Sequence, residues 1–393
     1  MNWRRNLWSL WVCCIISSSS YTMVVPFLPL YLHDLGVTDK SINIWAGLIF
    51  AASFLMSALM SPYWGRLADK TGKRRMVIRS GVSLAAVYFL GSLVDSPLQL
   101  LFVRLLQGVA TGFMPASLAI VASSVPEERM GFSLGLMQTA TLTGTIFGPL
   151  IGGGLAHIFG IRASFVVSGA IILAATLAVR LLVTEPPRHE LPAAGSVADD
   201  LRRALTDKVL RTMLLLIVLS QVAVMALQPL VTLHVAELQG SVAGAVLASG
   251  FVFSAAGVAG AIAAPLWGRL GQQAGYGRIL AAVFAGAGVF TVLTYFTANI
   301  WLFGLLQFAF GFFIAGVNPA VNTILVMNTE AAFRGRAFGL MMSANQLGSL
   351  IGPLVSGPAS AWTGIGAIFM AIGLMLLAVG LTVWRRLPVA GQV

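Results

Sequence analysis

Charged residues are scarce in this sequence. They make up 9% of its 393 residues, whereas about 25% is usual in soluble domains. Acidic residues are the fewest, with 13 Asp and Glu against 24 Lys and Arg, which gives a net charge of +11. A soluble fold of this length could not cover its surface with so few charges. The hydrophobic share of 58% and the mean hydropathy of +0.89 instead indicate a polytopic α-helical membrane protein.

Cysteine and clustered metal ligands are also nearly absent. Cys13 and Cys14 are adjacent within an apolar run, where neighbouring thiols are poorly placed for a disulfide or a metal site. No His, Cys and Asp residues have the spacing of a metal site, and no pair of carboxylates falls within an apolar run. We therefore expect neither an enzyme nor a bound metal or cofactor. Since the basic residues lie in short clusters between apolar runs, we also expect no nucleic-acid partner.

Long apolar runs are what the sequence has in abundance. About 20 apolar residues suffice to cross a bilayer as a helix, and twelve runs reach this length. They predict an all-α membrane protein with spans at residues 7–32, 43–65, 76–95, 98–122, 131–157, 162–184, 210–235, 243–268, 278–297, 300–325, 336–359 and 362–384.

Lys and Arg are distributed very unevenly among the predicted loops. Twenty-one of the 24 fall on one side, Lys40 and Arg162 fall on the other, and Arg104 falls within a span. Because basic loops are retained in the cytoplasm, this pattern predicts a multi-pass membrane protein with both termini in the cytoplasm. The pattern also favours an even number of spans.

Residues 185–209 form a long polar stretch with three prolines and several charges. We interpret it as a cytoplasmic linker that contains a short amphipathic helix near residues 197–207. The linker separates two predicted six-helix halves, at residues 1–184 and 210–393.

The two predicted halves repeat each other. The segment Pro62-Tyr-Trp-Gly-Arg-Leu67 recurs as Pro265-Leu-Trp-Gly-Arg-Leu270 at an offset of 203 residues, and Gly148-Pro149 recurs as Gly352-Pro353 at an offset of 204. A constant offset over this length indicates duplication of a six-span unit. Parallel repeats joined by a linker are typical of transporters with a cavity at the repeat interface. A channel would instead require pore-lining rings or a selectivity filter.

Three segments carry specific signals. The first, Gly65-Arg-Leu-Ala-Asp69-Lys-Thr-Gly72-Lys73-Arg74-Arg75, lies between the second and third spans, and its second-half copy has Gln272 where the acid would be. Gly72 permits a tight turn, and Asp69 can pair with a cation or with a helix N-terminus. The second is Arg104-Leu-Leu-Gln107-Gly108, in which an arginine inside a span costs at least about 2.5 kcal/mol.

The third segment is Gly144-Thr-Ile-Phe-Gly148-Pro149-Leu-Ile-Gly152 in the fifth span. Gly144 and Gly148 form a small face for close helix packing, and Pro149 can bend the helix. Generic membrane packing would also explain this segment when it is taken alone.

Together these segments resemble the major facilitator superfamily over the whole chain. The end of the first span, Pro26-Phe27-Leu28-Pro29, resembles its twelve-span drug:proton antiporter branch. This resemblance implies a protein of the bacterial cytoplasmic (inner) membrane. The resemblance implies a monomeric secondary transporter that exports drug-like, amphiphilic small molecules by proton antiport with alternating access. It implies gating by Gly65, Asp69, Gly72, Lys73 and Arg74, and an antiporter motif formed by Gly144, Gly148, Pro149 and Gly152. A facilitator or exporter of sugars or metabolites on the same fold is the alternative.

Proton coupling is harder to place, because none of the 13 acids falls in the middle of a span. Asp34 and Glu237 each lie eight residues after a span-end proline and are related by the repeat. We expect these two acids to carry the coupling, with Arg104 as a nearby cation, although both could be ordinary interfacial acids. Polar residues within spans are candidates for the substrate cavity or for contacts between helices. These are Tyr21, Gln107, Gln138, Gln221, Gln228, Asn318, Asn322, Asn345 and Gln346.

Overall fold

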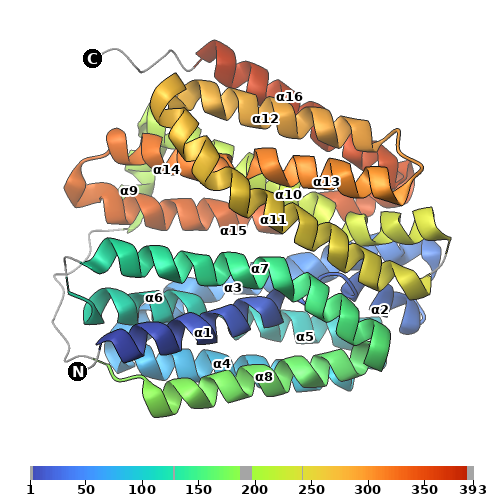
Figure 1. The fold of residues 1–393 in the computed structure, drawn as a ribbon, viewed down its shortest axis with the longest axis horizontal. Coiled ribbons are helices and arrows are strands. Elements are labelled where there is room, and N and C mark those ends of the chain that lie inside the picture. Colours follow the sequence, from blue (N-terminus) through green and yellow to red (C-terminus); the bar gives the residue numbers. More distant parts are fainter. Residues whose placement is uncertain (1–2, 127–128, 186–196, 241, 387–393) are drawn as a thin grey trace. The chain divides into compact units, whose positions relative to one another are not determined.

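The computed structural model describes residues 3–126, 129–185, 197–240 and 242–386 (Figure 1). Regular structure in these ranges is entirely helical and comprises sixteen helices. The chain divides into two compact units. One unit contains Met1–Glu190 and Val235–Ser254, and the other contains Leu191–His234 and Ala255–Val393. The boundaries of the predicted six-helix halves and of the linker remain a prediction.

The helices follow the predicted spans closely. The first eight are α1 (Trp3–Thr22), α2 (Leu28–Asp34), α3 (Asp39–Thr71), α4 (Lys73–Ser92), α5 (Pro97–Val109), α6 (Phe113–Ser124), α7 (Met130–Phe159) and α8 (Ile161–Leu182). The remaining eight are α9 (Val197–Thr206), α10 (Lys208–Gln239), α11 (Val242–Ala274), α12 (Tyr276–Thr294), α13 (Ile300–Ile314), α14 (Val317–Met327), α15 (Ala331–Thr363) and α16 (Ile365–Arg386). The short amphipathic helix expected near residues 197–207 is confirmed as α9.

Nine helical segments in the described ranges are long and apolar enough to cross a membrane. The other three predicted spans are also helical, as α1 with α2, as α4, and as α15. These helices carry charged or polar residues that lower their mean hydropathy. Arg4 and Arg5 lie in α1, Lys73–Arg75 begin α4, and Arg334 and Arg336 lie near the start of α15. The twelve predicted spans therefore all form helices.

Three of the spans that the apolar runs predicted as single helices are interrupted. The first breaks after Thr22 and resumes at Leu28, because Pro26 has no N–H to donate and Pro29 is suited to the first turn of a new helix. The fourth breaks at Gly112, whose φ of 117° is left-handed. The tenth breaks between Ile314 and Val317. Apolar length alone does not reveal such breaks.

The duplication seen in the sequence is present in the hydrogen bonds of each unit. Trp64 in α3 donates its indole N–H to the carbonyl of Val109 at 2.9 Å. Trp267 in α11 donates to the carbonyl of Phe312, also at 2.9 Å. Donor and acceptor are each displaced by 203 residues, which is the offset of the sequence repeat. Buried indole N–H groups need such partners. The two copies therefore share this contact between helices as well as the residue types.

The core of the first unit lies among α1, α4, α6, α7 and α8. Leu10 and Cys14 of α1, Ile120 of α6, Met137 of α7 and Val179 of α8 are all fully buried there. Figure 1 shows α1 running alongside α7, and α4 alongside α8. The ends of these helices lie near one another, and two clusters of charged side chains join them there.

Candidate functional site

Gly72 forms the turn between α3 and α4. Its φ of 106° and ψ of 140° end α3 and begin α4 without an intervening loop. This left-handed backbone favours glycine, because a Cβ atom would introduce strain. Gly275 repeats the turn between α11 and α12 with a φ of 88°. The surroundings of Gly65 and the side chain of Asp69, two of the predicted gating residues, lie outside what the structure describes.

A carboxylate from the segment after α8 binds the start of α4. Glu185 follows the end of α8, and its Oε1 and Oε2 accept hydrogen bonds from the backbone N–H groups of Lys73 (2.8 Å) and Arg74 (3.1 Å). The first N–H groups of a helix have no partner within the helix, and a negative charge near them is favourable. The sequence interpretation did not single out Glu185, whose one signal is its position directly after an apolar run.

The side chains of Lys73 and Arg74 strengthen the same junction. Arg74 Nη2 donates to the carbonyl of Arg180 in the last turn of α8, where carbonyl groups lack helical partners. Lys73 Nζ donates to the carbonyl of Ala119 in α6 at 3.2 Å. The start of α4 and the end of α8 therefore cap each other, and Lys73 attaches α4 to α6. We call this arrangement of Lys73, Arg74, Arg180 and Glu185 the α4–α8 clasp.

Arg79, one turn further along α4, contacts the break between α5 and α6. Its guanidinium lies 3.6 Å from the ring centroid of Trp64, and it donates to the carbonyls of Val109 (3.2 Å) and Thr111. Ser80 donates to the carbonyl of Ala110 at 2.5 Å. The carbonyl groups that the break frees are thus satisfied by side chains of α4, as buried backbone groups require.

Arg104 is buried within the first unit, with 5% of its surface exposed. Its Nε donates to the carbonyl of Ile49 at 3.2 Å, its Nη2 to Ser53 Oγ at 3.1 Å, and its Nη1 to Gln107 Oε1. All three acceptors are neutral. Among the described residues no carboxylate forms an ion pair with Arg104. The side chain thus remains a positive charge inside the membrane-spanning region, with hydrogen bonds but without a described counter-ion.

Gln107 extends this network toward α1. Its Nε2 donates to the hydroxyl of Tyr88 at 3.4 Å, and that hydroxyl donates to the carbonyl of Ser20 at 2.7 Å. Tyr88 and Gln107 are both buried. The hydrogen-bonded groups connect α5, α4 and α1. A change at Arg104 could therefore alter the hydrogen bond to the Ser20 carbonyl in the last turn of α1.

The glycines of the predicted antiporter motif pack directly on α1. A Cβ atom on Gly144 would lie 2.7 Å from the backbone N of Ser19, and one on Gly148 would lie 2.7 Å from the Ser19 carbonyl. Gly152 faces the carbonyl of Met23 in the same way. Thr22 Oγ1 donates to the Gly144 carbonyl at 2.9 Å. Close approach of the two backbones is therefore possible because these positions have no side chain. Pro149 lies buried within α7.

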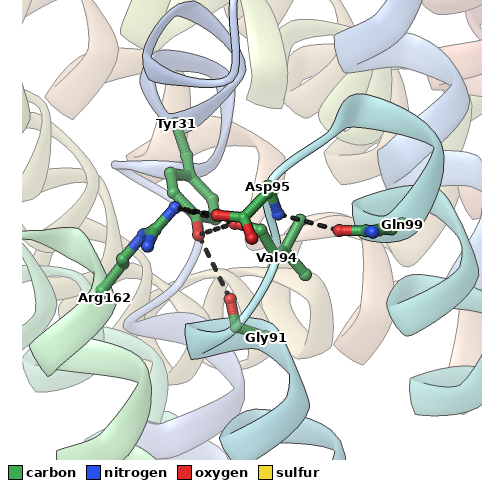
Figure 2. Close-up of polar contacts among 6 residues, drawn as sticks. All are labelled: Tyr31, Gly91, Val94, Asp95, Gln99 and Arg162. Carbon is green, nitrogen blue, oxygen red and sulfur yellow. Dashed lines mark hydrogen bonds and ion pairs between the residues drawn. The ribbon is translucent and has the colours of Figure 1, made fainter.

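A polar cluster joins α2, α4, α5 and α8 at the end of the first unit opposite the α4–α8 clasp (Figure 2). Arg162 Nη2 contacts Asp95 Oδ1 at 2.6 Å and donates to the Val94 carbonyl at 3.1 Å. The Tyr31 hydroxyl donates to the carbonyls of Gly91 (3.3 Å) and Val94 (3.2 Å). The side chains of Arg162 and Asp95 are 58% and 73% exposed, so water screens this ion pair and it adds little to stability.

Asp34 lies next to this cluster. It is exposed at the end of α2 and lines a pocket of about 250 Å³ with Tyr31, Arg162 and four other residues. The cation beside Asp34 is therefore Arg162, whereas the described contacts of Arg104 are to α3 and α5. The structure does not bring Asp34 and Arg104 together. Glu237 is exposed in the last turn of α10.

The candidate cavity residues lie in several environments. Gln107 is buried against Arg104, as described above. Gln138 and Asn318 are exposed. Gln221 lies against Gly348 of α15, where a Cβ atom would come within 2.7 Å of the Gln221 Cβ. The remaining candidates are partly buried, and these are Tyr21, Gln228, Asn322, Asn345 and Gln346. Their role in binding substrate stays a prediction.

Comparison with known proteins identifies the family. The sequence matches the profile of the Major Facilitator Superfamily over residues 10–258 and again over residues 213–392. The chain belongs to the Major Facilitator Superfamily. The two overlapping matches together span nearly the whole chain, which agrees with the resemblance inferred from the three sequence segments.

Curated relatives are similar over almost their full length. The chain is 35% identical to the multidrug resistance protein MdtG of Enterobacter lignolyticus (strain SCF1), covering 96% of this chain and 91% of the relative. It is 33% identical to MdtG of Citrobacter koseri, covering 98% and 96%. Similarity to multidrug resistance proteins agrees with the resemblance to the drug:proton antiporter branch that the sequence indicated. This superfamily member is thus a multi-pass transporter of small molecules, related to multidrug resistance proteins.

Solved structures agree on the fold. The nucleoside transporter NupG has a TM-score of 0.79 at 13% identity, covering 99% of this chain and 100% of that one. A bacterial homolog of the human lysosomal transporter Spinster has a TM-score of 0.79 at 15% identity, covering 98% and 96%. At these identities the likeness supports the twelve-helix fold and carries no information about the substrate.

Proposed function

We propose that this transporter exports drug-like, amphiphilic compounds across the bacterial inner membrane by proton antiport. The observation that carries the proposal is the full-length similarity to MdtG proteins, at 32–35% identity in three of these relatives. The similarity extends over both halves, so it covers the spans proposed to surround the substrate and the proposed gate segment. We further propose that it acts as a monomer, with both termini in the cytoplasm and two six-helix halves joined by the linker at residues 185–209.

The proposed gate is the segment from Gly65 to Arg74. The α4–α8 clasp supports this assignment, because Glu185 and Arg74 attach the ends of two membrane-spanning helices to each other at a glycine turn. Charge-assisted hydrogen bonds are about twice as strong as neutral ones, so this junction would hold the two helix ends together in one state of the proposed gate. Asp69 is proposed to complete the gate from α3.

The proposed coupling element is the Arg104 network, together with Asp34 and Glu237. A buried cation that has neutral partners is costly to keep in a membrane, and its retention favours a role in transport. Arg104 would favour the deprotonated form of an acid, or the binding of an anion, that approached it during the cycle. Asp34 and Glu237 are proposed to carry the proton at the outer ends of their spans.

The export proposal can be tested in a bacterial strain that lacks its other multidrug pumps. Expression of this protein should lower the accumulation of a fluorescent lipophilic cation, and a protonophore should restore it. The Arg104→Gln variant, expressed at the same level, is the matched control for non-specific effects of membrane overexpression. Unchanged accumulation across a panel of cationic, neutral and anionic drugs would contradict drug export.

Proton coupling requires a separate measurement. In proteoliposomes, addition of a transported drug should drive proton movement, and this movement should fall in the Asp34→Asn and Glu237→Gln variants. Undiminished movement in both variants would refute these two residues as proton carriers. Drug transport that persists without a proton gradient, and that moves no protons, would refute antiport itself while leaving the transport function intact.

A further inference from the structure

The short helix α9 has an apolar face and a polar face. Leu201 and Leu205 are four residues apart, so they lie on the same side of the helix, and Ala204 lies between this side and Arg203. Arg202, Arg203 and Thr206 lie on the rest of its circumference. Such a division is characteristic of helices that rest on another surface along their length. The contacts of α9 with neighbouring helices determine whether Leu201 and Leu205 face protein or an open surface.

Contacts with the start of α15 fix one side of α9. Arg203 Nη2 forms an ion pair with Glu330 Oε1 at 3.0 Å, and its guanidinium lies 4.4 Å from the ring centroid of Phe333. Ala204 is fully buried. This side of the helix is therefore occupied by the second unit itself.

Contacts with α10 fix the end of α9. A single residue, Asp207, separates the two helices, and its Oδ1 accepts from the backbone N–H groups of Val209 (2.8 Å) and Leu210 (2.9 Å). Arg211 Nη1 reaches back to the carbonyl of Leu205 at 3.3 Å. Since α10 is apolar enough to cross the membrane from Lys208 onward, α9 ends one residue from a spanning helix. It must lie close to the level of the lipid headgroups.

The face that remains open is apolar at its centre and basic beside it. Leu201 is 50% exposed and Leu205 is 58% exposed. Arg202, Lys208 and Arg211 are also exposed on this stretch, together with Asp207, whose carboxylate is engaged by the start of α10. Leucines flanked by cations are poorly suited to water, but they match a bilayer surface, where acyl chains lie beneath phosphate groups. Anionic lipids would add an attraction to each of the three cations.

We propose that α9 is an interfacial helix that binds anionic phospholipid. Leu201 and Leu205 enter the boundary between headgroups and acyl chains, and Arg202, Lys208 and Arg211 contact the phosphates. Glu330 precedes the first residue of α15. The lipid contact therefore acts on the starts of two spanning helices of the second unit, α10 through Asp207 and α15 through Arg203.

The proposal can be tested on the full-length protein in lipid nanodiscs. A Leu205→Cys variant is labelled with an environment-sensitive fluorophore, since the native Cys13 and Cys14 are buried. Quenching by a nitroxide lipid reports insertion, and quenching by iodide reports exposure to water. We expect lipid quenching at position 205 that increases when phosphatidylglycerol replaces part of the phosphatidylcholine. A combined Arg202→Gln and Lys208→Gln variant should lose the increase.

The matched control is a label at Thr206→Cys, on the polar face of the same helix, where iodide should quench more strongly than the nitroxide lipid. Strong iodide quenching at position 205 in every lipid would overturn the proposal, because the leucines would then lie in water. Lipid quenching that is indifferent to phosphatidylglycerol would overturn the headgroup contact. Protection from both quenchers would show that protein covers the leucines, which would also overturn it.

Discussion

Arg104 differs from its counterpart in the second repeat. The residue 203 positions later is Gln307, and both side chains are 5% exposed. The same buried position thus holds a charge in one copy and a neutral amide in the other. Since a buried glutamine satisfies the site structurally in the second copy, structural demands alone do not explain the arginine in the first.

Replacement of Arg104 by glutamine makes the first copy resemble the second. We expect Arg104→Gln to reduce drug-driven proton movement in proteoliposomes by about tenfold or more, equivalent to ~1.4 kcal/mol or more, while the protein still inserts and folds. Arg104→Lys should recover little, because a lysine ammonium does not reproduce the planar contacts to Ile49, Ser53 and Gln107. Gln307→Leu is the control and should transport at near wild-type rate. Wild-type coupling in Arg104→Gln would exclude a role for this charge.

Glu185 acts on the backbone of α4, which makes its effect distinguishable from that of an ion pair. We expect Glu185→Gln to destabilise the protein by about 0.3–1 kcal/mol, since the negative charge at the helix N-terminus is lost. Arg74→Gln should also be destabilising, because that side chain contacts the carbonyl of Arg180. Since both residues hold the same junction of α4 and α8, a double-mutant cycle measured by thermal unfolding should give a coupling energy of about 0.5 kcal/mol or more. Additive effects would show instead that the two contacts act independently.

At the scale of elements, the contact between α1 and α7 depends on positions without side chains. Gly148 faces the Ser19 carbonyl, whereas Gly154, further along α7, has no neighbouring helix among the described residues within 4 Å of the point where a Cβ atom would lie. We expect Gly148→Ala to destabilise the purified protein by about 1–3 kcal/mol through overpacking. Gly154→Ala should be neutral or slightly stabilising, because alanine favours helix by up to about 1 kcal/mol. Equal unfolding midpoints for the two variants would contradict the packing account.

The sequence was sufficient to predict which segments form spans, because apolar length and helical structure are tightly coupled in a bilayer. It did not predict where spans break. The break at Gly112 depends on a backbone conformation that side chains of α4 stabilise through Arg79 and Ser80, and these residues are distant in the sequence. Pro26 and Pro29 were visible, yet proline is tolerated within other spans such as α7.

The residues of the candidate site also divide into those that the sequence revealed and those that it did not. Motif residues such as Gly72, Gly148 and Arg104 could be recognised because their chemistry is unusual for a span or a turn. Glu185 could not, since an acid after a span is common and its role arises from the position of α4 beside α8. The expectation that Arg104 would accompany Asp34 relied on sequence position alone, and Arg162 lies beside Asp34 instead.

At the scale of the whole molecule, the duplication preserves the scaffold more closely than the chemistry. The tryptophan hydrogen bonds and the positive-φ glycine turns occur in both copies. Asp69 and Arg104 have the neutral residues Gln272 and Gln307 at the equivalent positions. We infer that the first copy carries most of the charged residues proposed for gating and coupling. The second copy repeats the helix contacts and turns without those charges.

The orientation of the whole molecule can be tested at the two ends of α11. Gln239 and Gln273 are both exposed and lie just before α11 and near its end. The unequal distribution of basic residues predicts that Gln239 faces outward and Gln273 faces the cytoplasm. Because the native cysteines are buried, an impermeant thiol reagent added to intact cells should label Gln239→Cys and not Gln273→Cys, and permeabilised cells should show labelling of both. The reverse pattern in intact cells would invert the orientation. Labelling of both sites in intact cells would mean that α11 does not cross the membrane.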